Sequence, residues 1–183
     1  MIKRNKTQKA GRNVPSKETE SENNDLRELF LDELADVYSA EKQLLKALPK
    51  MAKAAESDEL REAFENHLAE TETHAKRLEE VAESLDETIK RKTCAAMEGL
   101  VEEATDLMKE QKDSSALDAA LIAAAQKVEH YEIASYGTLC AWAEQLGESD
   151  AAETLNETLN EEKAADELLT GIAETQANPK GKR

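Results

Sequence analysis

Apolar residues recur every three or four positions along most of the chain, and this spacing predicts four long amphipathic helices. The predicted helices span residues 25–55, 58–86, 116–146 and 149–177. The apolar stripe of the second helix, for example, is formed by Leu60, Phe64, His67, Leu68, Leu78, Val81 and Leu85. Pro49 lies in the last third of the first helix, where its ring is expected to kink or break the helix.

Residues at the helix ends support these boundaries. Ser57 precedes two acids and predicts an N-cap, and Ser115 predicts another at the start of the third long helix. Gly147 is expected to stop that helix, and Asn178 and Pro179 are expected to stop the last one.

A shorter apolar-periodic segment between Thr93 and Lys112 predicts a crossover helix. Two tightly joined helices, one long connection and two more tightly joined helices are the order of a ferritin-like bundle. The sequence therefore predicts an all-α, ferritin-like four-helix bundle over residues 25–177. Residues 1–24 lack hydrophobic periodicity and are expected to form a flexible tail, and residues 178–183 a short basic one.

Charge is distributed unevenly along the chain. The formal net charge is −16 at pH 7, yet residues 1–17 carry six basic side chains and no acid, so residues 18–183 carry −22. An acidic body repels nucleic acid and anionic membranes, and it attracts metal cations. Nucleic acid is therefore expected to bind, if at all, only through the basic tail.

No apolar run approaches the roughly 20 residues of a membrane span, and no hydrophobic segment follows the basic N-terminus as a secretory signal requires. The protein is therefore expected to be cytoplasmic. Cys94 and Cys140 lack the spacing of a zinc site and are expected to be reduced thiols.

The chain contains an internal repeat. A shift of 91 positions places the first two long helices on the last two without a gap. Aligned pairs include Val37 with Val128, Leu68 with Leu159, Leu78 with Leu169, Glu41 with Glu132 and Glu70 with Glu161. Surface glutamates need not repeat together with the core, so the repeat predicts that some of these carboxylates face inward.

Individual positions support this interpretation. Glu41 lies on the apolar stripe between Val37 and Leu44, and Glu129 and Glu132 flank the stripe of the third long helix.

The other two long helices carry similar pairs of polar residues. Glu70 and His74 lie four residues apart, and Glu162 and Asp166 have the same spacing, with Glu161 adjacent as an alternative to Glu162.

Carboxylates buried without a partner cost several kcal/mol each, so cations are the simplest compensation. The predicted metal ligands are Glu41, Glu70, His74, Glu129, Glu132, Glu162 and Asp166. Oxygen-rich ligation with one imidazole favours two iron ions, or two manganese ions, over structural zinc, and Glu41 and Glu132 are expected to bridge them. The alternative is that these are solvated acids in a chain with 40 Asp and Glu residues.

Three segments resemble a known family. They are residues 32–51 (DELADVYSAEKQLLKALPKM), 119–134 (AALIAAAQKVEHYEIA) and 161–166 (EEKAAD). They resemble the YciE/YciF branch of the ferritin-like superfamily, and the resemblance extends over about residues 25–175. It implies a ferritin-like bundle, a homodimer, a role in bacterial or archaeal stress responses and a di-metal centre without a firmly assigned reaction.

The chain departs from the wider superfamily pattern, in which two helices each supply a Glu and two others a Glu-x-x-His motif. Thr71 stands three residues before His74, and Asp166 stands where a second His is usual. The pair Glu129 and Glu132 is similar to the doubled glutamates of rubrerythrin-type peroxidase sites.

Three functions remain open. The first is a redox enzyme, similar to a rubrerythrin-like peroxidase, that reduces peroxide or oxygen, with Tyr38 either tuning the site or simply packed in the core. The second is a non-enzymatic stress protein that sequesters metal or uses it structurally. The third is a DNA-protecting bundle that acts through the basic tail.

Overall fold

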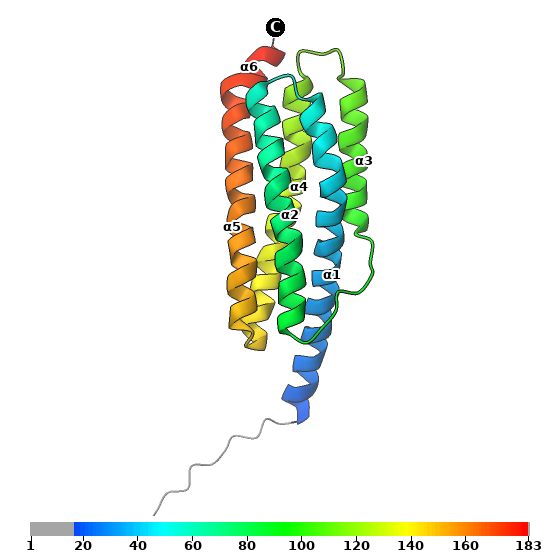
Figure 1. The fold of residues 1–183 in the computed structure, drawn as a ribbon, viewed down its shortest axis with the longest axis vertical. Helices are drawn as coiled ribbons and strands as arrows, with labels where there is room; N and C mark the ends of the chain where they lie inside the picture. Colours follow the sequence, from blue (N-terminus) through cyan, green and yellow to red (C-terminus); the bar gives the residue numbers. More distant parts are fainter. Residues whose placement is uncertain (1–16, 183) are drawn as a thin grey trace, which may run out of the picture.

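The chain folds as a bundle of long helices (Figure 1). The computed structural model describes residues 17–182. In chain order its elements are α1 (Lys17–Ala54), α2 (Asp58–Ser84), α3 (Ala95–Glu110), α4 (Leu117–Leu146), α5 (Ser149–Ile172), the π-helical turn η1 (Ala173–Ala177) and α6 (Asn178–Gly181). No strand occurs among these residues, and the all-α prediction is confirmed.

The four long helices form two antiparallel hairpins, α1 with α2 and α4 with α5. The shorter α3 lies beside α1 and α4. It belongs to the long connection that carries the chain from the lower end of α2 to the upper end of α4 in Figure 1. A single long crossover of this kind is the ferritin-like arrangement.

Two of the predicted helix ends are confirmed. The Ser57 hydroxyl accepts a hydrogen bond from the backbone N–H of Leu60, with 3.5 Å between N and Oγ, and caps α2. Gly147 follows α4 with φ at 83°, a left-handed conformation that a residue without Cβ adopts without strain.

The first helix is longer and more continuous than expected. α1 begins at Lys17, not at residue 25, because a helix that is already nucleated can extend without an apolar stripe. Residues 1–16 of the expected tail lie outside the described residues. α1 also runs through Pro49 without a break.

Two further boundaries are corrected. Ser115 does not cap α4, because Ala116 holds the N-cap position without a side-chain hydrogen bond and donates its backbone N–H to the Ser114 hydroxyl at 3.2 Å. The last long helix, α5, also does not end the helical path, which continues through η1 and α6 as far as Gly181. Pro179 fits the first turn of α6, where a missing N–H leaves no helix hydrogen bond unmade.

The core consists of two apolar halves. The first half includes Leu44, Leu48, Phe64, Leu121 and Ile172. The second half includes Phe30, Val37, Leu78, Leu139 and Leu155. Among the described residues, no helix has both the length and the apolar character that crossing a membrane requires.

Candidate metal centre

A layer of buried ionisable side chains separates the two apolar halves. This buried layer consists of Glu41 from α1, His67 and His74 from α2, Glu129 and Glu132 from α4, and Glu162 from α5. None of the six is more than 6% exposed, and every long helix contributes at least one. Asp118 is also buried, but it accepts hydrogen bonds from the backbone N–H groups of Glu56 and Ser57 at the turn between α1 and α2.

Two of the carboxylates lie inward as their stripe positions predicted. Glu41, between Val37 and Leu44, is 0% exposed, and its Oε1 accepts a hydrogen bond from the Tyr136 hydroxyl at 2.5 Å. Glu132 is also 0% exposed, and neither of its carboxylate oxygens has a hydrogen-bond partner.

His67 also belongs to this layer, although its spacing in the sequence predicts only a place on the apolar stripe of α2. Its Nε2 lies 3.5 Å from Glu129 Oε1 and 3.7 Å from Glu162 Oε2. Its Nδ1 lies 3.3 Å from Glu70 Oε2, on the outer side. The sequence does carry one signal for this position. His67 precedes His74 by seven residues, about two helical turns, and this spacing puts both rings on one face of the helix.

His74 lies between an inner and an outer carboxylate. Its Nδ1 is 3.0 Å from Glu162 Oε1 and 3.7 Å from Glu41 Oε1. Its Nε2 is 2.9 Å from Glu161 Oε2, and Arg77 donates to the same carboxylate. Of the two adjacent glutamates on α5, Glu162 therefore faces the layer and Glu161 holds the histidine from outside.

Two groups of these side chains have potential ligand atoms within 4.8 Å of one another. The first group is His67, Glu129, Glu132 and Glu162, and the second is Glu41, His74 and Glu162. Because both contain Glu162, the groups adjoin. Glu41 and Glu132, which we expected to be shared, each belong to one group only.

Two of the predicted ligands, Glu70 and Asp166, lie outside both groups. On α2 the inward position is taken by Thr71, which is 0% exposed, and Glu70 lies about 100° away around the helix. The Glu70 side chain is 47% exposed. Asp166 accepts a hydrogen bond at 3.0 Å from Gln126 of α4, so its carboxylate is engaged between α4 and α5.

Tyrosine also differs from the expectation. The Tyr38 hydroxyl donates to Glu79 at 2.6 Å, an exposed contact away from the layer. The tyrosine that contacts the layer is Tyr136, through Glu41.

Hydrogen bonding leaves the buried layer unsatisfied. In residues 25–182, whose side chains are described, eight buried side-chain oxygen and nitrogen atoms lack a hydrogen-bond partner. They are Glu41 Oε2, His67 Nε2, His74 Nδ1, Glu129 Oε2 and both carboxylate oxygens of Glu132 and Glu162. The two histidine nitrogens do lie in ion pairs with Glu129 and Glu162, at 3.5 and 3.0 Å. Each buried atom without a hydrogen-bond partner costs about 1–3 kcal/mol, so the concentration of such atoms in one layer demands compensation. Carboxylate oxygens and imidazole nitrogens are suitable metal ligands, so these residues could hold a metal ion.

Burial also keeps protons on the layer when no metal is bound. It raises the pKa of Glu41 to about 8, with repulsion from Glu162 adding to the effect, and it raises that of Glu129 to about 8. Burial raises the pKa of Glu132 well above its usual value. For His67, burial lowers the pKa, but the Glu129 carboxylate and its neighbours outweigh this effect and raise it to about 10. A bound cation would displace these protons, since metal ligands must be deprotonated.

Comparisons with known proteins agree with this architecture. The family described as "Domain of unknown function (DUF892)" matches residues 25–181. Protein YciF of Escherichia coli strain K12 is 51% identical over 156 residues, which cover 85% of this chain and 94% of that protein.

Solved structures are similar as well. The crystal structure of the E. coli stress protein YciF has a TM-score of 0.81 and 52% identity, and covers 84% of this chain and 97% of that one. YcfI from Rhodopseudomonas palustris has a TM-score of 0.77 and 45% identity, and covers 81% and 94%. A protein from Xanthomonas campestris pv. campestris, with a TM-score of 0.67, 24% identity and coverage of 85% and 95%, shows the fold alone. From the match over residues 25–181 and the 51% identity to YciF, the chain belongs to the DUF892 family of YciF-like, ferritin-like helical bundles.

Proposed function

We propose that this chain is a stress-response protein whose buried layer holds two metal ions, iron or alternatively manganese, and reduces peroxide or oxygen at them. The observation that carries the proposal is that all eight unpartnered buried atoms in residues 25–182 belong to six converging residues. The description of the E. coli relative as a stress protein supports the physiological setting.

The two groups support the following set of ligands. One ion would be held by His67, Glu129 and Glu132, the other by Glu41 and His74, and Glu162 would lie between them. Four carboxylates would balance the charge of two divalent ions, and each ion would receive one imidazole nitrogen.

Outer carboxylates orient both histidines. Glu70 contacts Nδ1 of His67, and Glu161 contacts Nε2 of His74, so each ring presents its other nitrogen to the layer. Carboxylates in this position fix the tautomer of a metal-bound histidine and strengthen it as a ligand.

The chain's own residues would also position protons. Hydrogen peroxide would take one electron from each of two ferrous ions and two protons, which yields two water molecules. The Tyr136 hydroxyl, hydrogen-bonded to Glu41, holds a proton at the edge of the layer. Apolar packing on both sides of the layer limits the access of bulk water along the bundle.

A non-enzymatic protein that sequesters metal or is held together by it would use the same ligands. Metal that binds only the native state stabilises the bundle in either case, so a stability measurement does not distinguish the two functions. Consumption of peroxide does. We also propose a homodimer, from the family resemblance, which sedimentation at micromolar concentration would test. DNA binding through residues 1–17 rests on a segment that, except for Lys17, lies outside the described residues, and it stays a prediction.

Elemental analysis and a single-turnover assay test the proposal. Protein loaded anaerobically with ferrous iron should bind two ions per chain and consume one hydrogen peroxide for every two ions oxidised. Glu162→Ala should lose both properties, whereas Glu167→Ala, at an exposed position of the same helix, should keep them. Metal binding without peroxide consumption would favour the non-enzymatic function, and absence of metal binding would reject both.

A further inference from the structure

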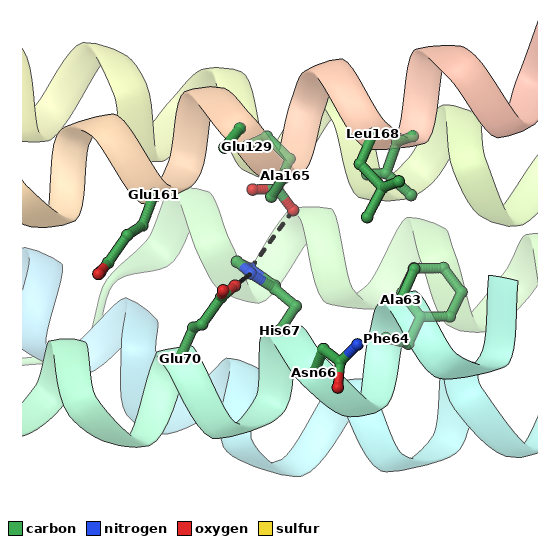
Figure 2. A pocket seen from close by; sticks show the side chains of 11 residues that line it. Ala63, Phe64, Asn66, His67, Glu70, Glu129, Glu161, Ala165 and Leu168 are labelled. Atoms are coloured by element: carbon green, nitrogen blue, oxygen red, sulfur yellow. Dashed lines mark hydrogen bonds and ion pairs between the residues drawn. The ribbon is translucent and has the colours of Figure 1, made fainter. Parts of the chain in front are cut away.

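A pocket between α2 and α5 leads from the surface to the buried layer (Figure 2). It has a cavity volume of about 180 Å³. Apolar groups of Ala63, Phe64, Ala165 and Leu168 form much of its wall. His67 and Glu129, which are 6% and 2% exposed, also line it and mark its inner end.

The inner end carries polar atoms that the protein leaves unpartnered. His67 Nε2 and Glu129 Oε2 both lack a hydrogen-bond partner, although the two residues form an ion pair at 3.5 Å. Convergent polar atoms at the end of an apolar pocket are what a small ligand needs to bind in one orientation. Both residues belong to the first of the two groups, so the pocket reaches the layer from that side.

The position that the 91-residue repeat relates to the pocket lies near Arg77 of α2, and there the side chains tie α2 to α5. Arg77 is the counterpart of Leu168 under the shift of 91 residues. Its guanidinium donates hydrogen bonds to Thr158, at 3.2 Å, and to Glu161, and so ties α2 to α5. Leu168 cannot form such a tie, and it is 49% exposed beside the pocket. Between α2 and α5, the side chains therefore tie the two helices at Arg77 and leave a pocket at Leu168.

A second difference between the two halves of the repeat leaves space in the pocket. Ala165 is the counterpart of His74, so a methyl group stands where the other half has an imidazole. The resulting cavity has room for several groups the size of a water molecule, which occupies roughly 30 Å³ in the liquid. A compact molecule with a small substituent fits this volume.

Charge at the pocket restricts the ligand further. The carboxylates of Glu70 and Glu161 line it, with side chains 47% and 36% exposed. Such carboxylates repel anions, whereas the methyl and phenyl walls favour an apolar group. The pocket therefore suits a neutral molecule with one polar and one apolar end.

We propose that this pocket binds hydroperoxides that carry a compact apolar substituent, with the substituent between Phe64 and Leu168 and the oxygen pair at the inner end, beside the ion that His67 and Glu129 would hold. The inference rests on the proposed function, because reduction requires the two-metal centre. In the balanced reaction the O–O bond breaks and two O–H bonds form. The hydroperoxide takes up two protons and two electrons, one from each of two ferrous ions, and yields an alcohol and water.

Leu168→Arg is designed to close the pocket, because it introduces the residue type that the repeat places at the equivalent position, Arg77. The repeat relates the pair Leu168 and Glu70 to the pair Arg77 and Glu161, and both Leu168 and Glu70 line the pocket. The new guanidinium is therefore expected to pair with Glu70 across the mouth. The matched control is Leu29→Arg, because Leu29 on α1 is also 49% exposed and does not line the pocket.

Binding is tested first in the metal-free protein. The probe is tert-butanol, which has the substituent of tert-butyl hydroperoxide but cannot be reduced. Saturable shifts are expected in the methyl NMR signals of Ala63 and Ala165, and in Leu29→Arg they should persist. In Leu168→Arg the affinity should fall about tenfold or more, because burial of about two methyl groups is lost.

Single turnover with ferrous-loaded protein then tests the substrate class. The parent and Leu29→Arg should reduce tert-butyl hydroperoxide at the same rate, and Leu168→Arg should be about tenfold slower. Hydrogen peroxide, which has no substituent to accommodate, should be affected less.

The results separate this inference from the proposed function. Consumption of hydrogen peroxide without tert-butanol shifts, or with equal shifts in parent and Leu168→Arg, would overturn the pocket as a hydroperoxide site while the peroxidase function stands. Saturable tert-butanol binding in a metal-loaded protein that reduces neither peroxide would overturn the proposed function and, with it, the hydroperoxide as substrate.

Discussion

Both histidines of the buried layer have a carboxylate behind them. Glu70 lies 3.3 Å from His67 Nδ1, and Glu161 lies 2.9 Å from His74 Nε2. The two opposite nitrogens, which face the layer, are the ones without a hydrogen-bond partner. Because a hydrogen-bonded outer nitrogen fixes the tautomer, this arrangement prepares the inner nitrogens to accept a metal ion.

Removal of one outer carboxylate should therefore weaken metal binding without touching a ligand. Glu161→Ala is expected to lower the affinity for the ion at His74 about 10- to 100-fold. The control is Glu157→Ala, because Glu157 also pairs with Arg77, at 3.4 Å, but has no contact with His74. Competition with a chelator of known affinity measures the effect. Equal affinities in the two variants would show that Glu161 does not act through the histidine.

At the scale of single residues, the sequence predicted much of the layer. Five of the seven predicted ligands converge, namely Glu41, His74, Glu129, Glu132 and Glu162. Glu70 and Asp166, also predicted, lie outside both groups because a step of four residues rotates a side chain by about 40°, and packing decides which neighbour turns inward. His67 was read as part of an apolar stripe because that stripe is a property of one helix, whereas the carboxylates beside His67 come from two others.

At the scale of elements, the turn between the first two helices is anchored on the fourth. Asp118 of α4 is 2% exposed and accepts hydrogen bonds from the backbone N–H groups of Glu56, at 2.8 Å, and Ser57, at 3.0 Å. These amides precede α2, whose first turn the Ser57 hydroxyl caps. One carboxylate thus fixes the start of the helix that carries both histidines of the layer.

Asp118→Ala should destabilise the bundle by about 3 kcal/mol, because it leaves two partly buried amides without their acceptor. Urea unfolding of the metal-free protein measures this loss. Asp113→Ala, at an exposed position before α4, should leave the midpoint unchanged. Metal content should stay the same in both variants, since Asp118 lies outside both ligand groups. An unchanged midpoint in Asp118→Ala would mean that the turn is held by other contacts.

The elements themselves could be predicted because their signals are local. Apolar stripes identified the long helices and the crossover helix, and Ser57 and Gly147 marked their ends. The start of α1 and the continuation past α5 were missed, since helix extension and the tolerance of Pro179 in a first turn depend on neighbouring structure.

At the scale of the molecule, the buried layer makes stability depend on pH. The folded-state pKa values of Glu41 and Glu129, about 8, lie above the 4.5 of an ordinary glutamate, and that of His67, about 10, lies above 6.5. For all three groups the folded protein binds more protons than the unfolded chain. Their contribution is therefore complete at low pH and is lost as the pH rises through these folded-state values.

The thermal midpoint of the metal-free protein should consequently fall between about pH 5 and pH 9. Scanning calorimetry in the presence of a chelator measures it. With metal bound, the stabilisation by the ion should instead grow with pH, because protons compete with the cation for the same atoms. A metal-free midpoint that rises over this range would contradict the assigned protonation of the layer.

The repeat predicted the general symmetry of the molecule but not the positions at which the two halves differ. Glu41 and Glu132 occupy equivalent buried positions, as expected. Thr71, however, stands opposite Glu162 in the repeat, and its hydroxyl donates to the His67 backbone carbonyl at 2.8 Å. The candidate ligands are therefore asymmetric between the two halves. This asymmetry depends on contacts among four helices, and an alignment of one half with the other contains no information on such contacts.

The most direct test of the two-metal centre is anomalous X-ray diffraction at the iron edge from crystals of the iron-loaded protein. We expect two anomalous peaks per chain, one among His67, Glu129, Glu132 and Glu162 and the other among Glu41, His74 and Glu162. Peaks only at surface carboxylates, or no peak in the buried layer, would contradict this expectation.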